Sequence, residues 1–495
     1  MKKRCLSALF ALLLALQAAA SALSDARTYI EKTVPKPEHA YAGGEWAVVG
    51  LAESGGVPDA YAKAYYAALR SAVNEKGAIL HERKRTENAR AVIALAALGK
   101  SPYSVGGADI LSPLEEVRAA SSQGLNGAVF ALLALDAAKA VSSSREAYIA
   151  AILAAQGADG GFAVTGGAEA DVDLTAMALA ALAPYRARSA VKTAVGRGLA
   201  FLEGAWNETG GYGSAECTAQ IVIALVSLGI SPDNSRFVHD GKSLSDELAA
   251  YAVSGGGYRH LKSDKTADLM ASEQALLALT ALANGRSPYA PKSTMRRDAA
   301  VKKPAVIRTG KRFADVKNAA ESAAVTALYA RGVINGKSEE TFAPLDTMTR
   351  AEFAAVVTRS LGLVYTGAHP FTDVGAGAWY EGAVLAAYRY GITTGTSAKT
   401  FSPDGTITRQ EAYTMLARAA GLCGMDTDVL PGVMSRTAAG TAGFDGLSAY
   451  AKAPMAFAVG SGIAQSNAVT DADVAVSRAE IAVALYKLLE RSAML

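Results

Sequence analysis

Phe313-Ala314-Asp315-Val316 opens a stretch that ends at Thr349-Arg350-Ala351-Glu352, and the same pattern occurs three times in the last third of the chain. The other copies run from Phe371-Thr372-Asp373-Val374 to Thr408-Arg409-Gln410-Glu411 and from Phe444-Asp445 to Ser477-Arg478-Ala479-Glu480. Each copy predicts a helix ending at glycine, a loop, and a second helix that begins at Thr or Ser. Units repeated at about 50 to 70 residues are too small to bury a core alone. We therefore expect the three repeats to pack together.

The end of each repeat combines a structural signal with a candidate binding residue. Thr or Ser followed three residues later by Glu is a capping box, which satisfies the first amides of a helix. The intervening arginine is not needed for capping and is unfavourable near a helix N-terminus. A guanidinium grips a carboxylate bidentately, and helix-start amides also attract anions. We therefore expect Arg350, Arg409 and Arg478 to bind an acidic ligand.

The pattern closely resembles the S-layer homology (SLH) module, which holds bacterial proteins non-covalently on the cell wall. The resemblance implies a three-lobed helical bundle whose grooves bind pyruvylated secondary cell-wall polysaccharide through the arginine. It also implies that a few other residues shape the grooves, namely Asp315, Asp373, Asp445, Gly336 and Gly395.

The three repeats differ in the aromatic residue expected to stack on a sugar. Repeat 2 has Trp379, repeat 3 has Tyr450 in roughly that place, and repeat 1 offers only Ala320 or Glu321. Repeat 3 also lacks the Phe-x-Pro type of loop. We therefore expect one groove, or two, to bind well; a purely structural bundle is the alternative.

The chain begins with the features of a secretory signal. Lys2-Lys3-Arg4 precedes an apolar run to Ala20, and Ala20-Ser21-Ala22 is a small-x-small cleavage site, so residues 1–22 are predicted to be removed on export. An uncleaved anchor is the alternative, although the run is short for a membrane span. The net charge of +3 is scattered, which argues against a nucleic-acid partner. Cys5 leaves with the signal, and we expect no disulfide between Cys217 and Cys423.

Residues 25–290 are helical by pattern, with six apolar segments spaced about 40 to 55 residues apart. Several are apolar on nearly every face, as expected of helices enclosed by a second layer. Six such inner helices, each with a more polar outer helix, would close into an (α/α)6 toroid. The rest of the chain divides into a Pro-rich basic linker (291–311) and the three repeats (312–365, 370–422 and 443–495).

Glycine-aromatic turns precede several inner segments, as in Gln156 to Phe162 and in Trp206 to Tyr212. These turns are similar to the repeat of the prenyltransferase and squalene-cyclase superfamily, which implies the toroid fold. Asp171-Val172-Asp173-Leu174-Thr175-Ala176 is similar to the acidic motif of class II terpene cyclases, in which Asp173 would be the general acid. However, Leu174 replaces an acid, and the module has few aromatic residues to stabilise carbocations.

Zinc is the cofactor of the prenyltransferase branch, bound through Asp, Cys and His. Only Cys217 and His260 are candidates here, so we expect no metal and no cofactor. Cobalamin-binding toroids pair with a small β domain, and no β-rich segment follows residue 290.

An acid or amide stands near the start of each inner segment. Capping explains this preference, but in a toroid the same side chains would also form a polar ring at the cavity mouth. The residues expected there are Glu45, Asp171, Asp173, Thr175, Glu216 and Glu273.

The sequence thus predicts an all-helical, exported protein on the bacterial cell surface. The repeats would hold the wall polysaccharide, and the toroid would bind an unknown ligand or protein rather than act as an enzyme. Two alternatives remain: a terpene cyclase-like enzyme that uses Asp173, and a structural surface-layer protein.

Overall fold

The computed structural model describes residues 20–165, 168–207, 210–291 and 295–495. Within these ranges all regular elements are helices, and strand-like pairing is limited to isolated bridges. The prediction of an all-helical fold is confirmed for this part of the chain. Most of the predicted signal peptide, with Cys5, lies outside the described residues. Among the helices that are described, none is long and apolar enough to cross a membrane.

The chain divides into two compact units. The first comprises Met1–Ala72, Ile79–Gly99 and Leu111–Thr294, and the second comprises Val73–Ala78, Lys100–Ile110 and Met295–Leu495. Cys217 lies in the first unit and Cys423 in the second, and both are free thiols.

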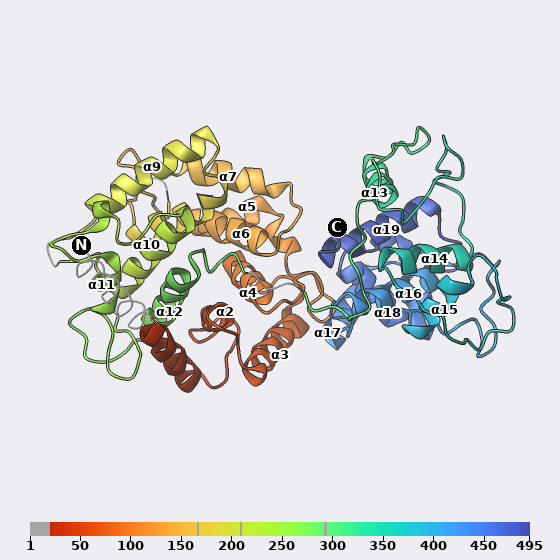
Figure 1. Ribbon diagram of the computed structural model, residues 1–495, viewed down its shortest axis with the longest axis horizontal. Helices are drawn as coiled ribbons and strands as arrows, with labels where there is room; N and C mark the ends of the chain where they lie inside the picture. Colours follow the sequence, from red (N-terminus) through yellow and green to blue (C-terminus); the bar gives the residue numbers. More distant parts are fainter. Residues whose placement is uncertain (1–19, 166–167, 208–209, 292–294) are drawn as a thin grey trace, which may run out of the picture. The chain divides into compact units, whose positions relative to one another are not determined.

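Six apolar helices of the first unit pack in a closed series, and those that Figure 1 labels lie on the inner side of this unit. In chain order each packs against the next, and the last packs against the first. They are α2 (Glu45–Glu53), α4 (Arg85–Ala97), α6 (Leu125–Ala137), α8 (Val172–Leu182), α10 (Ala215–Leu228) and α12 (Leu269–Asn284). In α10 nearly every side chain is buried, as its continuous apolar sequence predicts.

Other helices of the first unit bury only one face. They include a helix at residues 20–33, α3 (Asp59–Lys76), α7 (Ser144–Ala154) and α9 (Ser189–Gly204), with the shorter α5 (Val117–Ala120) and α11 (Leu244–Ala249). On α3 the buried residues Tyr61, Tyr65 and Leu69 recur every four positions and form one apolar stripe. Helices α7, α9 and α11 pack against α6, α8 and α10, respectively, and therefore cover the inner helices from outside.

The glycine-aromatic turns are anchored to the inner helices. The amide of Phe162 donates to the hydroxyl of Thr175 on α8 at 2.9 Å, and the amide of Tyr258 donates to Ser272 on α12 at 2.8 Å. Gly160 has φ +90°, and a Cβ atom there would meet the carbonyl of Arg197. Each turn thus fixes where its aromatic residue is buried and where the next inner helix begins.

The second unit is built from a helix pair in each repeat. The helices are α13 (Ala319–Ala330) and α14 (Arg350–Ser360), α15 (Glu381–Arg389) and α16 (Arg409–Leu422), and α18 (Ala449–Gly460) and α19 (Arg478–Arg491). The first helix of each repeat packs against the second helix of the preceding repeat: α15 on α14, α18 on α16, and α13 on α19. The repeats are therefore interlocked in a cycle, and the prediction that they pack together is confirmed.

The stretch between repeats 2 and 3 is ordered, although its sequence predicts only a flexible connector from Gly421 to Gly443. It contains α17 (Pro431–Gly440), which packs against α18. Just before α17, the amide of Leu430 donates to the carbonyl of Gly106, and the carboxylate of Asp426 accepts the amide of Gly106. The connector prediction failed because these partners lie more than 300 residues away in the sequence.

Candidate functional site

The second helix of each repeat begins against a loop of the following repeat. Thr349, Thr408 and Ser477 cap their helices through the amide three residues on, as the sequence predicts. The first two amides of each helix donate to carbonyls of the following repeat: those of α14 to Gly405 and Pro403, those of α16 to Val474 and Ala472, and those of α19 to Asp346 and Pro344. These helix-start amides are therefore paired within the protein and are not free to bind an anion.

The opening acids of repeats 1 and 2 hold the loops in place. The carboxylate of Asp315 accepts the amides of Phe342 and Ala343, and that of Asp373 accepts those of Phe401 and Ser402. Burial raises the pKa of each acid, but these amides outweigh that effect and lower both values below the ordinary one.

Asp445 does not share this role. It follows its phenylalanine directly rather than after one intervening residue, and it is exposed in a short 3-10 helix, Phe444–Gly446. Gly336 and Gly395 lie against the opening phenylalanines, where a Cβ atom would meet the ring of Phe313 or Phe371. These glycines therefore shape the loops through close packing.

Two of the three motif arginines are buried between repeats. Arg350 is 5% exposed; its Nε donates to the carbonyl of Phe401 at 2.8 Å and its Nη1 donates to Glu411 at 2.8 Å. Arg478 is 6% exposed, and it donates to the carbonyls of Phe342 and Asn335. Both side chains stack within about 5 Å of the phenylalanine ring whose carbonyl they bind. They tie each repeat to the next.

Arg409 differs, because it lies in a groove of about 550 Å³. Its side chain is 22% exposed, and its Nε donates to both carboxylate oxygens of Glu480, at 3.1 and 2.9 Å. The groove is lined by all three repeats, including Ala320 and Glu321 at the start of α13 and Asp471 in the loop of repeat 3. Repeats 1, 2 and 3 are thus all needed to build this groove.

Because the repeats pack in a cycle, the aromatic residue and the motif arginine of one groove come from different repeats. Tyr450 lies near Glu411 and Arg350, which influence its pKa, so the aromatic of repeat 3 belongs with the arginine of repeat 1. Arg478 lies near Glu352 on α14, the helix on which α15 packs, so the cyclic order assigns Trp379 to Arg478. Trp379 itself is 67% exposed. Trp379 and Arg409 share a repeat in the sequence but not a groove.

Several residues expected at the mouth of the first unit have internal partners. Asp171 is the N-cap of α8 and accepts the amide of Leu174 at 2.7 Å. Thr175 is fully buried and holds the turn at Phe162. These two residues position the start of α8.

Glu45 and Glu273 are buried where α12 meets α2. Glu45 binds His39 Nδ1 at 2.7 Å and accepts from the Tyr65 hydroxyl at 3.1 Å. Burial raises the pKa of Glu45, but the bond and charge of His39, the charge of Arg90 and the amide of Ala40 outweigh it and lower the pKa. Glu273 accepts the amide of Gly43 at 2.8 Å, but burial dominates and raises its pKa to about 7. Both carboxylates are buried, and Glu273 lies in the second turn of α12, which begins at Leu269.

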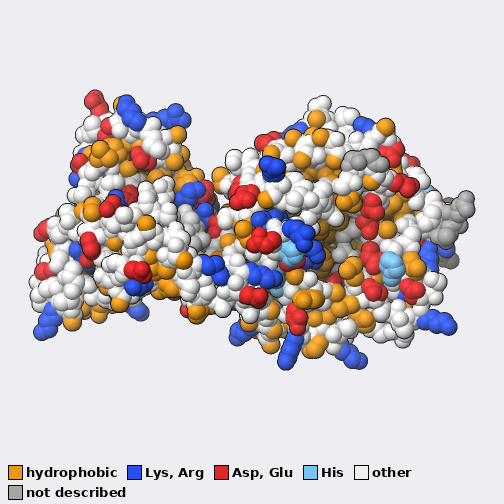
Figure 2. Space-filling view, turned by 180° about the vertical axis from the view of Figure 1, so that it is seen from behind, with side chains coloured by type: hydrophobic (Ala, Val, Ile, Leu, Met, Phe, Trp, Pro, Cys, Tyr) orange, Lys and Arg blue, Asp and Glu red, His pale blue; other side chains and the backbone are white. Residues whose placement is uncertain are grey.

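Asp173 and Glu216 form the remaining polar cluster, together with Cys217 and His260. Burial raises the pKa of Asp173; a hydrogen bond with Cys217 opposes the rise, and Asp171 and Glu216 add to it. In the described part of the chain the buried Oδ1 of Asp173 has no hydrogen-bond partner. Glu216 binds His260 at 2.9 Å and raises its pKa. On the face of the first unit in Figure 2, acidic side chains gather beside a histidine.

Aromatic side chains pack close to this cluster. Trp46 stacks on Phe130 at 5.8 Å and meets Tyr289 edge-on at 5.6 Å. Tyr289 follows α12, is buried, and binds Gln220 at 3.1 Å. Among the described residues, no group of three or more His, Cys, Asp and Glu side chains is arranged to hold a metal ion.

Sequence reasoning missed Asp471 and Cys217 as neighbours of the candidate residues. The repeats contained a signal for Asp471, because it occupies the loop equivalent to Pro344 and Pro403 of the other repeats. Cys217 is the third residue of α10, next to Glu216, so the inner-helix register would have placed it at the same end as Asp173.

Comparison with known proteins identifies the first two repeats. Residues 312–354 and 370–412 match the S-layer homology domain family. The Surface-layer 125 kDa protein of Lysinibacillus sphaericus is 43% identical over 101 residues, 20% of this chain and 9% of that protein. Endo-1,4-beta-xylanase A of Thermoanaerobacterium saccharolyticum is 37% identical over 108 residues, 21% of this chain and 9% of that protein.

A longer match is Exoglucanase XynX of Acetivibrio thermocellus, 31% identical over 195 residues, which are 38% of this chain and 17% of that protein. The chain thus spans 9 to 17% of the length of these three relatives. Together with the two matched domains, these similarities place the chain among cell-surface proteins that carry S-layer homology domains.

Proposed function

We propose that the second unit anchors the chain to the cell wall by binding an acidic, pyruvylated polysaccharide in grooves between the repeats. The observation that carries this proposal is the accessible guanidinium of Arg409 in a groove lined by three repeats. Glu480 fixes the side chain, and a bound carboxylate would complete a charge-assisted pair. Glu321 and Asp471 also line the groove, and carboxylates accept hydrogen bonds from sugar hydroxyls.

The test is co-sedimentation of the full chain with purified cell walls before and after acid removal of pyruvyl groups. Arg409→Ala is expected to weaken binding about ten- to a hundredfold, the range for a hydrogen bond to a charged group. Arg389→Ala is the matched control, because Arg389 is exposed on α15 and outside the groove. Equal binding to treated and untreated walls would overturn the proposal.

We propose further that the first unit is an (α/α)6 toroid that binds a ligand without converting it. The support for the fold is the cyclic order of contacts among α2, α4, α6, α8, α10 and α12. The support for binding is the polar cluster of Asp173, Cys217, Glu216 and His260, which lies at one end of α8 and α10.

A terpene cyclase-like activity is the second candidate, favoured by one specific observation. Burial raises the pKa of Asp173, as a general acid requires, and Tyr289 of the nearby aromatic group lies within electrostatic reach of Asp173. Incubation with linear polyprenyl substrates, followed by mass spectrometry, separates the two candidates. Cyclic products that disappear in Asp173→Asn would favour the enzyme, whereas binding without turnover would favour the toroid as a binding module.

A further inference from the structure

The basic segment before the repeats lies against the second unit. We call residues 295–312 the strap. It contains no helix, and most of its side chains are exposed, in agreement with the extended linker predicted from composition. Its backbone, however, is bonded along its length to the ends of helices, so it does not behave as a free spacer.

Strap amides donate to carbonyls at the C-termini of three helices. Asp298 donates to Leu422 at the end of α16, Lys302 donates to Leu361 at the end of α14, and Ile307 donates to Ala330 at the end of α13. The three N···O distances are 2.8, 2.8 and 2.9 Å. The last carbonyls of a helix have no intrahelical partner, so an external donor satisfies groups that would otherwise need water.

Two strap arginines extend the same arrangement. Arg297 Nη2 donates to the carbonyls of Ser492 and Ala493 just after α19, both at 2.9 Å. Arg308 Nε donates to the carbonyl of Tyr329 at 2.7 Å, and its guanidinium lies 3.5 Å from that ring's centroid. Cations are favourable at helix C-termini because the helix dipole is negative there. This accounts for the basic composition of the strap.

The helix ends accommodate the strap closely. Gly362 and Gly424 follow α14 and α16 with φ of +62° and +88°, the left-handed region that favours glycine. A Cβ atom on Gly362 would meet Lys302, and one on Gly424 would meet the carbonyl of Arg296. The glycines after the helices and the strap residues therefore pack closely against each other.

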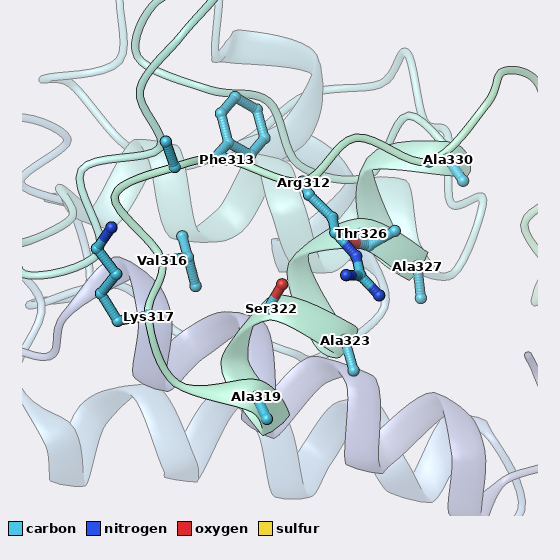
Figure 3. Close-up of a pocket in the computed structure, with 12 residues that line it drawn as sticks. Arg312, Phe313, Val316, Lys317, Ala319, Ser322, Ala323, Thr326, Ala327 and Ala330 are labelled. Carbon is cyan, nitrogen blue, oxygen red and sulfur yellow. The ribbon is translucent and has the colours of Figure 1, made fainter.

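The strap ends beside α13. The hydroxyl of Thr326 donates to the carbonyl of Lys311 at 3.2 Å. Figure 3 shows Arg312 lying over this helix, above Thr326, at a pocket of about 760 Å³ whose floor is formed by small side chains such as Ala323 and Ala327. The strap therefore contacts helix ends from repeats 1, 2 and 3 in succession.

We infer that the strap is a structural clasp of the repeat unit, which caps helix C-termini of all three repeats and holds them in their closed cycle. This role is separate from wall binding, because the strap lies outside the repeat motifs. Closure of the cycle depends on α13 reaching α19, and Arg308 and Arg297 bind the ends of these two helices.

Hydrogen exchange of the full chain, followed by mass spectrometry, tests this inference. The amides of Asp298, Lys302 and Ile307 are expected to exchange at least about tenfold more slowly than in an unstructured chain, because they are bonded to helix ends. In the double variant Arg297→Ala/Arg308→Ala, exchange in the strap and in the last turns of α14 and α16 is expected to rise about tenfold.

The matched control is Arg296→Ala/Lys302→Ala, which removes the same charge from exposed strap positions and keeps the Lys302 backbone and Cβ contacts. Exchange in this control is expected to stay at the level of the native chain. Strap amides that exchange at unstructured rates in the native chain would overturn the inference. So would a double variant whose helix ends exchange as slowly as those of the control.

Discussion

Arg350 and Arg409 occupy the same motif position in two neighbouring repeats but have different surroundings. Arg350 is buried against the carbonyl of Phe401, whereas Arg409 is partly exposed in a groove lined by Ala320 and Glu321. Both arginines pair with the capping-box glutamate of the following repeat, Glu411 or Glu480. The difference arises because the following repeat also supplies a phenylalanine carbonyl and ring to Arg350, while Arg409 meets the carbonyl of Asp471. The shared motif therefore fixes where the arginine lies in its repeat. Contacts from the neighbouring repeat determine whether the arginine is buried in the structure or accessible to a ligand.

The first unit contains a similar contrast among its carboxylates. Glu45 begins α2 and Glu273 lies in the second turn of α12, and both are buried and bonded to the chain around residues 39–43. Asp173 and Glu216 are only partly buried and lie together near His260. In both units, some members of a repeated polar set hold the fold together, and the others remain available to a ligand.

The largest expected effect concerns the buried arginines. Arg350→Ala leaves a buried carbonyl and Glu411 without their partner, which is expected to cost about 3 kcal/mol in the stability of the second unit. Arg409→Ala removes a more exposed ion pair and is expected to cost about 1 kcal/mol or less. Native-state hydrogen exchange of α16 amides measures both values. Equal losses in the two variants would remove the distinction between them.

Stability against pH tests the contrast between the two buried glutamates. The pKa of Glu273 is raised to about 7 from 4.5, so its contribution is present below pH 4.5 and is lost as pH rises toward 7. Glu273→Gln keeps an acceptor for the Gly43 amide and is expected to stabilise the first unit by about 2 kcal/mol at pH 8, with little effect at pH 4.

The contribution of Glu45 to stability has the opposite pH dependence, because the pKa of Glu45 is lowered. Glu45→Gln is expected to destabilise the first unit at pH 7, and the loss should shrink as pH falls through the pKa of Glu45. Urea denaturation of both variants at pH 4 and pH 8 provides the comparison. The same pH trend in the two variants would contradict the account.

The smallest effect concerns the groove around Arg409, whose aromatic lining residue, Tyr413, is buried against Glu480 and offers no exposed ring. Ala320→Trp places a ring at the position that Trp379 and Tyr450 occupy in the other grooves. Stacking of an aromatic face contributes about 1 kcal/mol, so wall binding is expected to tighten about fivefold. Ala323→Trp, on the same helix but outside this groove, serves as the control. Tightening by the control alone would show that the groove assignment is wrong.

The sequence predicts those features that depend on nearby residues. The capping boxes at Thr349 and Thr408 involve partners three residues away, and the burial of α10 follows from its continuous apolar sequence. The partners of Arg350 and Arg297 could not be predicted, because Phe401 and Ser492 lie 51 and 195 residues away. For the same reason the exposure of Arg409 and the pairing of Trp379 with Arg478 follow only from the packing of the repeats.

The most direct test of the central claim locates the bound polysaccharide among the three grooves. Hydrogen exchange of the full chain is measured with and without the purified, pyruvylated polysaccharide. The account predicts slower exchange at residues 463–471 and at the start of α13, which line the groove of Arg409. Protection confined to the surroundings of Tyr450 or Trp379, with none at residues 463–471, would contradict it.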